Sequence, residues 1–491
     1  MIGEPDYIGP SATALLDTVP AGPGCARDPS DGDFAPESRR PLRRLLLIAY
    51  QFPPVGGAGV QRVTKFVKCL PQFGWQANVL TVENPSVPVT DHSLLADVPA
   101  DTLVARAATW EPGYSVKSLV LAEASQAARS PVSRLKSAAK RALRRLANLC
   151  LQPDPQVLWA PNAIRLGRSL LARERYDAIL ASGPPFSTLL VGRALSLSSG
   201  LPLVVDYRDE WGLANSYMEN RQFGRLASWV QQRQQAGILK SARAIIATTR
   251  ASTDHLDHAA RKCASDAQAH CIFNGFDRDD FPDDHAPSMD QRTDSPLRLV
   301  YVGTLWKMTS LAPLAGALRV LANRVSDLSR RLELVVAGRR TTEEQEVLTK
   351  LNAEIGCLRE VPYLEHRDAV ALMQSADLLL VSLSGLPGAE RILPAKVFEY
   401  LAVGRQIMAI TPPGELWDLL ERHSNADLFD PADANGIADH LEFRLECRSS
   451  GLALPEAFAN LDGLDRVSQS RQLANILDCL VGDAATATEL A

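Results

Sequence analysis

Short apolar runs and longer amphipathic segments alternate along the chain from about residue 43 onward. The apolar runs predict buried strands, and the segments with a helical period predict helices between them. In the first half the predicted strands are 45–50, 78–82, 178–182, 203–207, 244–248 and 270–274, and the predicted helices include 60–73, 162–174 and 186–198. Such alternation is typical of βαβ units on a parallel sheet, so this half predicts one doubly wound α/β domain.

The same alternation begins again after residues 277–295, an acidic, Pro-containing stretch without a period that predicts a linker. The later predicted strands are 297–303, 332–338, 378–383 and 406–410, and the helices are 311–324, 342–355, 367–376 and 464–480. Two similar doubly wound sheets leave a cleft between the carboxyl ends of their strands, where such sheets bind ligands. The predicted division is a disordered extension 1–40, a Rossmann-like domain 41–276, a linker 277–296, a second Rossmann-like domain 297–462, a helix 463–481 and a tail 482–491.

Composition and charge exclude several other classes of protein. The 491 residues are 46% hydrophobic and 22% charged, as expected for a soluble protein with more than one core. A net charge of -5 gives no general attraction to nucleic acid. No segment reaches the roughly 18 apolar residues that span a bilayer, and the N-terminus has no secretory signal pattern. The eight cysteines include no C-x-x-C pair, so we expect reduced thiols in a cytoplasmic protein and no metal site.

The segment 388–410, GAERILPAKVFEYLAVGRQIMAI, carries the strongest chemical signal. A helix that begins near Pro394 and Ala395 leaves its first N–H groups unpaired and directs the positive end of its dipole toward the preceding loop. A diphosphate fits there. Lys396 adds a point charge, and Glu399, one turn later, can accept hydrogen bonds from a ribose diol. The alternative is an ordinary helix start with a solvated lysine and glutamate.

Several segments resemble one family in the same order along the chain. They are YQFPPVGGAGV, SGPPFST, VVDYRDEW, IFNGFDRDDF, YVGTLW, VVAGRR and PAKVFEYLAVG. Together they resemble the retaining glycosyltransferases of family 4, in the bacterial polysaccharide branch, from about residue 45 to 480. The resemblance implies a GT-B fold, a nucleoside-diphosphate sugar as donor, and a lipid-linked or polysaccharide hydroxyl as acceptor. It also implies retention of the anomeric configuration, a hexose-type sugar, and no cofactor or metal, because loop N–H groups and cations neutralise the diphosphate.

In the first domain, the resemblance points to a glycine loop and to the end of one strand. Gly56 and Gly57 let backbone N–H groups approach a ligand without a Cβ in the way; the alternative is a tight strand-to-helix turn. Arg208 stands where many family members carry a histidine that meets the donor sugar. Because an arginine stays protonated, it cannot act as a general base. Arg208 either binds an anion or orients Asp209, or the two form a structural salt bridge.

In the second domain, the loop that Gly303 opens has a family counterpart with an arginine and a lysine on the diphosphate. Thr304 stands at the arginine position, and Lys307 is close to the lysine position. Arg339 can add charge, and Tyr363 lies in the loop that frames the nucleobase. Each of these is also explained as a solvated loop residue. The candidate catalytic residues are therefore Arg208, Asp209, Lys307 and Lys396.

The family's paired-glutamate motif is incomplete here. Counting back from Glu399 places Arg391 at the first glutamate position, with Glu390 displaced by one. The first glutamate usually contacts the donor sugar, so Arg391 predicts recognition of an acidic or otherwise modified sugar. The D-x-D strings at 31–33 and 277–279 resemble metal-diphosphate motifs of another fold, but we place them in the extension and in the linker.

Residues 134–151, RLKSAAKRALRRLANLCL, combine an apolar stripe with six cations and no acid. A helix of this kind lies on anionic bilayers, which predicts peripheral association with the inner face of the plasma membrane. The alternative is a surface helix packed on the first domain. Two other functions also remain open for the whole chain: a nucleotide-sugar epimerase of the same fold, or a non-catalytic scaffold of a polysaccharide assembly complex.

Overall fold

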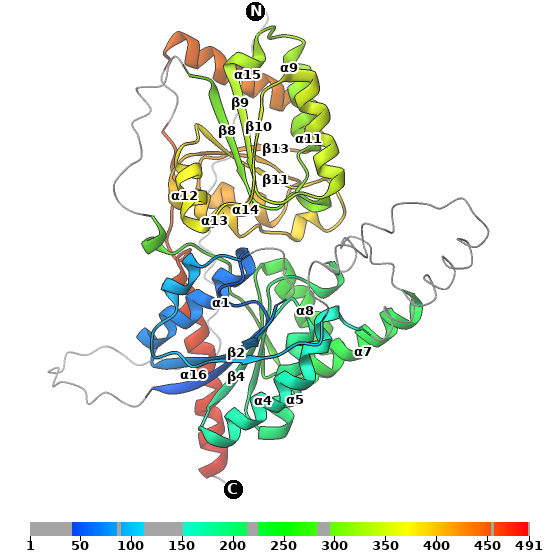
Figure 1. Cartoon of the computed structure of the whole chain (residues 1–491), viewed down its shortest axis with the longest axis vertical. Helices are drawn as coiled ribbons and strands as arrows, with labels where there is room; N and C mark the ends of the chain where they lie inside the picture. The colour runs from blue at the N-terminus through cyan, green and yellow to red at the C-terminus, as the bar shows by residue number, and fades with distance from the viewer. Residues whose placement is uncertain are drawn as a thin grey trace, which may run out of the picture. The chain divides into compact units, whose positions relative to one another are not determined.

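The structure is a computed structural model that describes residues 42–85, 90–111, 151–213, 224–281, 295–452 and 456–489 (Figure 1). The extension 1–40 and most of the predicted basic helix 134–151 lie outside these residues, as do residues 31–33. The described part contains two parallel sheets with helices on both faces of each. Within those ranges, no helix combines the length and the apolarity that a membrane crossing requires.

The N-terminal sheet has seven strands in the order β3-β2-β1-β4-β5-β6-β7. The strands are β1 Arg43–Ala49, β2 Trp75–Val82, β3 Val104–Ala107, β4 Ala178–Gly183, β5 Leu203–Tyr207, β6 Ala244–Ala247 and β7 Gln268–Cys271. Every pair of neighbours is parallel. With the helices between them, these strands form what we call the N-terminal lobe.

Both faces of this sheet are buried, because side chains alternate along each strand and helices cover both sides. Leu46 and Ile48 of β1 face one core, which packs α4 Ala160–Arg173, α5 Ser187–Ser199, α7 Arg225–Ser241 and α8 Arg250–Lys262. Leu45 and Leu47 face the other, which packs α1 Ala58–Cys69 and the C-terminal helix α16 Arg466–Glu489. The C-terminal helix therefore returns to the N-terminal lobe.

The C-terminal sheet has six strands in the order β10-β9-β8-β11-β12-β13. They are β8 Leu297–Val302, β9 Leu332–Ala337, β10 Leu358–Val361, β11 Leu378–Ser382, β12 Gln406–Ile410 and β13 Asp427–Phe429. One face is covered by α9 Ala312–Ala322, α11 Thr342–Ile355 and α15 Ala434–Ser450. The other is covered by α12 His366–Gln374, α13 Lys396–Val403 and α14 Glu415–His423. This is the C-terminal lobe.

The predicted strands and helices are all present, and their ends lie within a few residues of the prediction except at α16, which continues to Glu489 beyond the predicted end at residue 480. The sequence pattern missed the short outer strands β3, β10 and β13, which are three or four residues long. A difference also appears at the start of the predicted linker. Residues Arg278–Asp280 form a 3-10 helix, η5, that is bound to α1 through ion pairs.

Candidate functional site

The carboxyl ends of β8 and β9 bring two glycine loops together. Leu305 N donates to Arg339 O over 2.7 Å, so the loops after these strands lie side by side. Gly303 has φ +143° and Gly338 has φ +121°. A Cβ added at Gly338 would lie 2.3 Å from Gly303 O, and both backbones are in the region that favours glycine. The loop after β8 is thereby held against its neighbour.

Lys396 begins α13 directly behind this loop. Its Nζ lies 3.5 Å from the ring centroid of Tyr301, and a Cβ at Gly303 would lie 2.7 Å from that Nζ. Among the described residues, no carboxylate forms an ion pair with this ammonium. Burial lowers the pKa of Lys396 well below its usual range, although Glu399 opposes this. A bound anion would favour the charged form, as phosphate at a helix N-terminus does.

Glu399 faces a small polar network instead of open solvent. The side chain is 14% exposed, and its Oε1 lies 3.9 Å from His366 Nδ1. Gln61 Nε2 of α1 lies 2.9 Å from the same His366 Nδ1, and His366 Nε2 lies 3.1 Å from Asp280 Oδ2. Burial raises the pKa of Glu399, while His366 and Arg466 lower it. Glu399 therefore links the C-terminal lobe to α1 of the N-terminal lobe.

Arg391 is already paired with a carboxylate of the chain. Its Nη1 lies 3.0 Å from Glu210 Oε2, and the Glu210 side chain is only 2% exposed. Ser252 Oγ donates to the other Glu210 oxygen over 3.0 Å. The displaced Glu390 accepts a hydrogen bond from Gly388 N over 2.8 Å, within its own loop. The guanidinium at the first glutamate position thus joins the loop after β11 to the loop after β5.

Arg208 holds three loops of the N-terminal lobe together. Its guanidinium donates to Gly59 O of the glycine loop and to Pro184 O of the SGPPFST turn, and over 3.4 Å to Gln51 Oε1. A Cβ added at Gly59 would lie 3.0 Å from Arg208 Nη1. Arg208 is buried, and its neighbour Asp209 is exposed. These contacts make Arg208 a positioning residue for the loops that edge this sheet.

The remaining predicted residues lie at the carboxyl edges of the two sheets. Thr304, Lys307 and Arg339 are exposed, and Thr304 takes part through its carbonyl, which accepts from Thr309 Oγ1 over 2.7 Å. Gly57 has φ +114° at the start of α1. Burial raises the pKa of Tyr363, and its hydroxyl is close enough to the Gly57 backbone for a hydrogen bond to affect that pKa. Gly56 adjoins Gly57 in the same turn.

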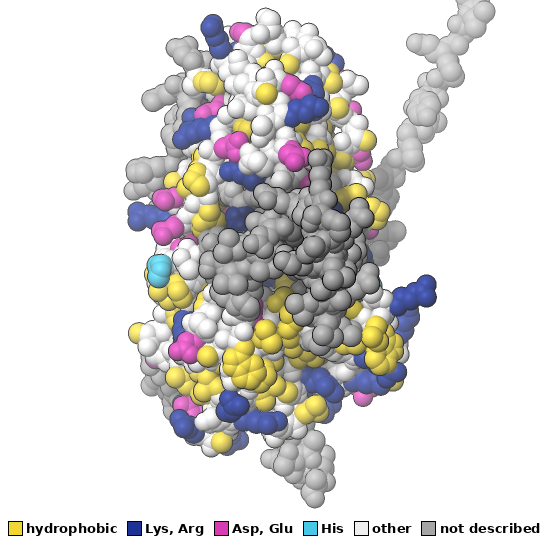
Figure 2. Space-filling view, turned by 45° about the vertical axis from the view of Figure 1, so that its right-hand side comes forward, with side chains coloured by type: hydrophobic (Ala, Val, Ile, Leu, Met, Phe, Trp, Pro, Cys, Tyr) yellow, Lys and Arg dark blue, Asp and Glu magenta, His cyan; other side chains and the backbone are white. Residues whose placement is uncertain are grey.

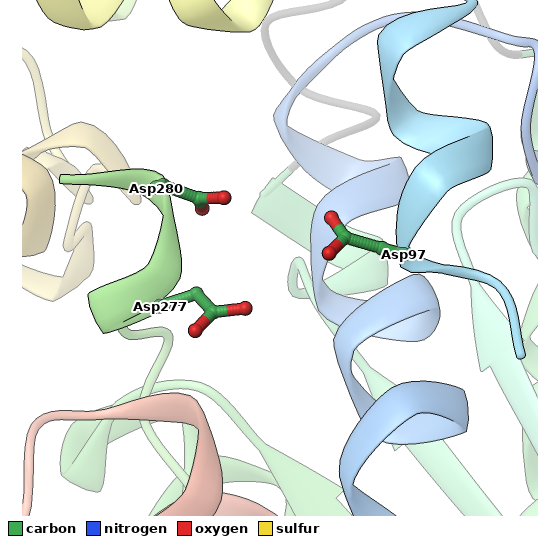
Figure 3. A group of neighbouring side chains, drawn as sticks. All are labelled: Asp97, Asp277 and Asp280. Atoms are coloured by element: carbon green, nitrogen blue, oxygen red, sulfur yellow. The ribbon is translucent and has the colours of Figure 1, made fainter. Parts of the chain in front are cut away.

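Three carboxylates, drawn in Figure 3, have the arrangement of a metal site, but two lysines form ion pairs with them. The oxygens of Asp97, Asp277 and Asp280 lie within 4.8 Å of one another. Lys65 Nζ lies 2.7, 2.7 and 2.9 Å from them, with its side chain 2% exposed. Lys68 Nζ lies 2.7 Å from Asp277. Ammonium groups already neutralise these oxygens, so the group is explained as a structural ion cluster.

Sequence reasoning missed Glu210, His366, Gln61 and the lysine–aspartate cluster. A signal for the cluster was present: Lys65 and Lys68 are three residues apart on one face of a predicted helix, and 277–280 is a string that contains three aspartates. No comparable signal identifies Glu210 or His366, because their partners are distant in the sequence.

Comparisons with known proteins agree with this architecture. Residues 56–261 match the family described as "Glycosyl transferase 4-like domain". A search of curated protein sequences finds no match to the chain.

Solved structures show the same fold over nearly the whole chain. Sucrose-phosphate synthase from Thermosynechococcus elongatus is 15% identical with a TM-score of 0.56, covering 91% of this chain and 98% of that one. Trehalose 6-phosphate synthase from Burkholderia multivorans is 12% identical with a TM-score of 0.55, covering 90% and 100%. HepE from Anabaena, in complex with UDP and glucose, is 15% identical with a TM-score of 0.51, covering 91% and 100%. The predicted GT-B fold is confirmed, and the residues that match the glycosyltransferase 4-like family lie in the N-terminal lobe.

Proposed function

We propose that the protein is a glycosyltransferase that moves a hexose-type sugar from a nucleoside-diphosphate sugar to a hydroxyl of a lipid-linked or polysaccharide acceptor, with retention of configuration. One observation carries the donor part of the proposal. Lys396 is a half-buried lysine at the start of α13, without a carboxylate ion pair among the described residues, beside Gly303, whose backbone lies in the region that favours glycine. A partly desolvated cation without a counter-ion costs free energy, and a diphosphate would supply the counter-ion.

The chemistry follows from the same residues. Departure of the nucleoside diphosphate places negative charge on the leaving phosphate, and the α13 N-terminus with Lys396 stabilises that charge. Lys307 and Arg339, exposed on the adjoining loops, can add charge to the same phosphates. Preorganised groups of this kind commonly contribute several kcal/mol to the transition state. No metal takes part in this proposal, since the cationic groups do the neutralising.

The two lobes take different parts of the reaction in this proposal. The C-terminal domain, 297–462, binds the donor, with Glu399 toward the ribose and Tyr363 toward the base. The N-terminal domain, 41–276, binds the acceptor near the loops that Arg208 holds. Arg391 is neutralised by Glu210, so an acidic donor sugar must displace that carboxylate to reach the guanidinium. The reaction takes place in the cytoplasm, at the inner face of the plasma membrane when the acceptor is lipid-linked.

A thermal-shift screen of nucleotides and nucleotide-sugars tests the proposal. A ligand at 100 times its dissociation constant stabilises by about 2.7 kcal/mol, which is easily measured. We expect one nucleoside diphosphate and its sugar conjugates to stabilise the protein, and the conjugate to be turned over when acceptor is added. Binding without any transfer or hydrolysis would favour the scaffold, and conversion of the donor sugar without acceptor would favour the epimerase.

A further inference from the structure

Three helices on one face of the N-terminal lobe carry cations without any acidic residue. The helices α4, α5 and α7 contain no aspartate or glutamate, although the chain has 57 acidic residues against 52 basic ones. These helices pack on the same core as α8, which carries both acidic and basic residues. Their exposed cations are Arg165, Arg168, Arg173, Arg225, Arg233 and Lys240. The face is therefore basic on a protein whose net charge is negative.

Large apolar side chains stand among these cations on α7. Leu226 is 56% exposed and Trp229 is 52% exposed. They are three residues apart, so they lie on one face of the helix. Arg225 and Arg233 lie four residues before and after Trp229, and Arg233 Cζ is 5.1 Å from the Trp229 ring. In the lower half of Figure 2, hydrophobic side chains gather beside Lys and Arg side chains on the side that includes these helices.

The apolar groups lie at the edge of the sheet where substrates are expected. Because α7 follows β5 and returns antiparallel to it, Leu226 and Trp229 in its first turns lie near the carboxyl end of that strand. Trp110, 62% exposed, follows the carboxyl end of β3. Asn162 Nδ2 of α4 donates to Ala108 O over 2.8 Å, which fixes the segment before Trp110 against the start of α4. The exposed aromatic residues therefore border the same edge as Arg208.

We propose that this face docks on an anionic lipid bilayer, with Leu226 and Trp229 inserted at the level of the headgroups and the cations against the lipid charge. Tryptophan and leucine with flanking arginines are typical of helices that lie in a membrane interface. The surface is distinct from residues 134–150, which lie outside the described residues. The docking rests on the proposed function in one respect: it would bring a lipid-linked acceptor to the carboxyl edge of the N-terminal sheet. Binding to the bilayer does not itself require transferase activity.

Sedimentation of the full chain with lipid vesicles tests the docking. The vesicles contain phosphatidylglycerol and phosphatidylcholine, or phosphatidylcholine alone, at low and high salt. We expect binding to the anionic vesicles at low salt and little to the neutral ones. Arg225→Gln with Arg233→Gln should weaken the affinity by roughly fivefold for each charge removed. Leu226→Ser with Trp229→Ser should abolish the part of the binding that survives high salt, because that part comes from apolar insertion.

The matched control removes two exposed cations from the C-terminal lobe, Arg330→Gln with Lys350→Gln, and should bind vesicles as the wild type does. Far-ultraviolet circular dichroism establishes that each variant is folded. Wild type that ignores anionic vesicles, or α7 variants that bind as well as the control, would overturn the proposal. Nucleotide binding is measured on the same samples. If the wild type binds vesicles through α7 but binds no nucleotide, the proposed function is contradicted while the docking proposal stands.

Discussion

Two lysines of the same chain, Lys65 and Lys396, have opposite surroundings. Lys65 of α1 has three carboxylates within 2.9 Å, and its pKa is raised although burial alone lowers it. Lys396 of α13 is half-buried against Tyr301 without a carboxylate ion pair among the described residues, and desolvation lowers its pKa well below its usual range. The first lysine has its counter-ions within the fold. The second has no such counter-ion among the described residues, which is why we assign it to a ligand and Lys65 to stability.

Removing Lys65, the lysine that is paired with three carboxylates, should have the largest effect on stability. Lys65→Met leaves Asp97, Asp277 and Asp280 close together with Lys68 as their nearest remaining ammonium. Breaking a buried ion cluster by deleting one partner typically costs about 3–5 kcal/mol. Urea unfolding followed by circular dichroism measures this loss. If Lys65→Met unfolds at the same urea concentration as the wild type, the cluster does not stabilise the fold, and the contrast drawn between Lys65 and Lys396 is wrong.

Acid should weaken the same cluster of Lys65 and its carboxylates. Burial raises the pKa of Asp277, but Lys65 and Lys68 outweigh it and lower the pKa to about 2. A carboxylate with a depressed pKa stabilises the fold above its unfolded pKa of 3.8, and this contribution is lost as the pH falls toward 2. The free energy of unfolding should therefore fall between about pH 5 and pH 2. In Asp277→Asn that part of the decrease should be missing; an unchanged acid profile would contradict the assignment.

Glu399→Ala should weaken binding of the free nucleoside, because a ribose diol loses a charged acceptor worth roughly 1.5–3 kcal/mol. Calorimetric titration with the nucleoside identified in the screen measures the change. His366→Gln is the companion variant: it keeps Glu399 and alters only the neighbour 3.9 Å away. It should weaken nucleoside binding less. Equal nucleoside affinity in wild type and Glu399→Ala would place Glu399 outside the site, in the network that joins the lobes.

The pair between Arg391 and Glu210 should make the smallest contribution. The Arg391 side chain is 29% exposed, so we expect a coupling on the order of 1 kcal/mol in a double-mutant cycle of Arg391→Gln and Glu210→Gln. Urea unfolding of the four proteins gives the coupling. A value of zero would mean that the two side chains do not stabilise each other, and Arg391 would again be available to an acidic sugar.

The fold was predictable because its strands and helices depend on local sequence patterns. The site was only partly predictable because several of its side chains pair with residues far away in the sequence. Periodicity located the central strands, since each is an apolar run bounded by turn residues, but it missed β3 and β10, which are too short to show a period. The glycine loops and the start of α13 were visible because their chemistry lies within one segment. Arg391 was visible, but its partner Glu210 lies 181 positions earlier, and only the fold brings the two together.

Binding of the nucleoside and of its diphosphate to Lys396→Met tests the central claim most directly. Methionine keeps the length and apolar contacts of the lysine stem and removes the ammonium that lies over Tyr301. We predict that the nucleoside binds Lys396→Met and wild type equally, and that the diphosphate binds the variant about 10- to 100-fold more weakly, the loss of a charge-assisted contact. Equal affinity of both proteins for the diphosphate would show that Lys396 does not meet phosphate, and the assignment of the site would fall with it.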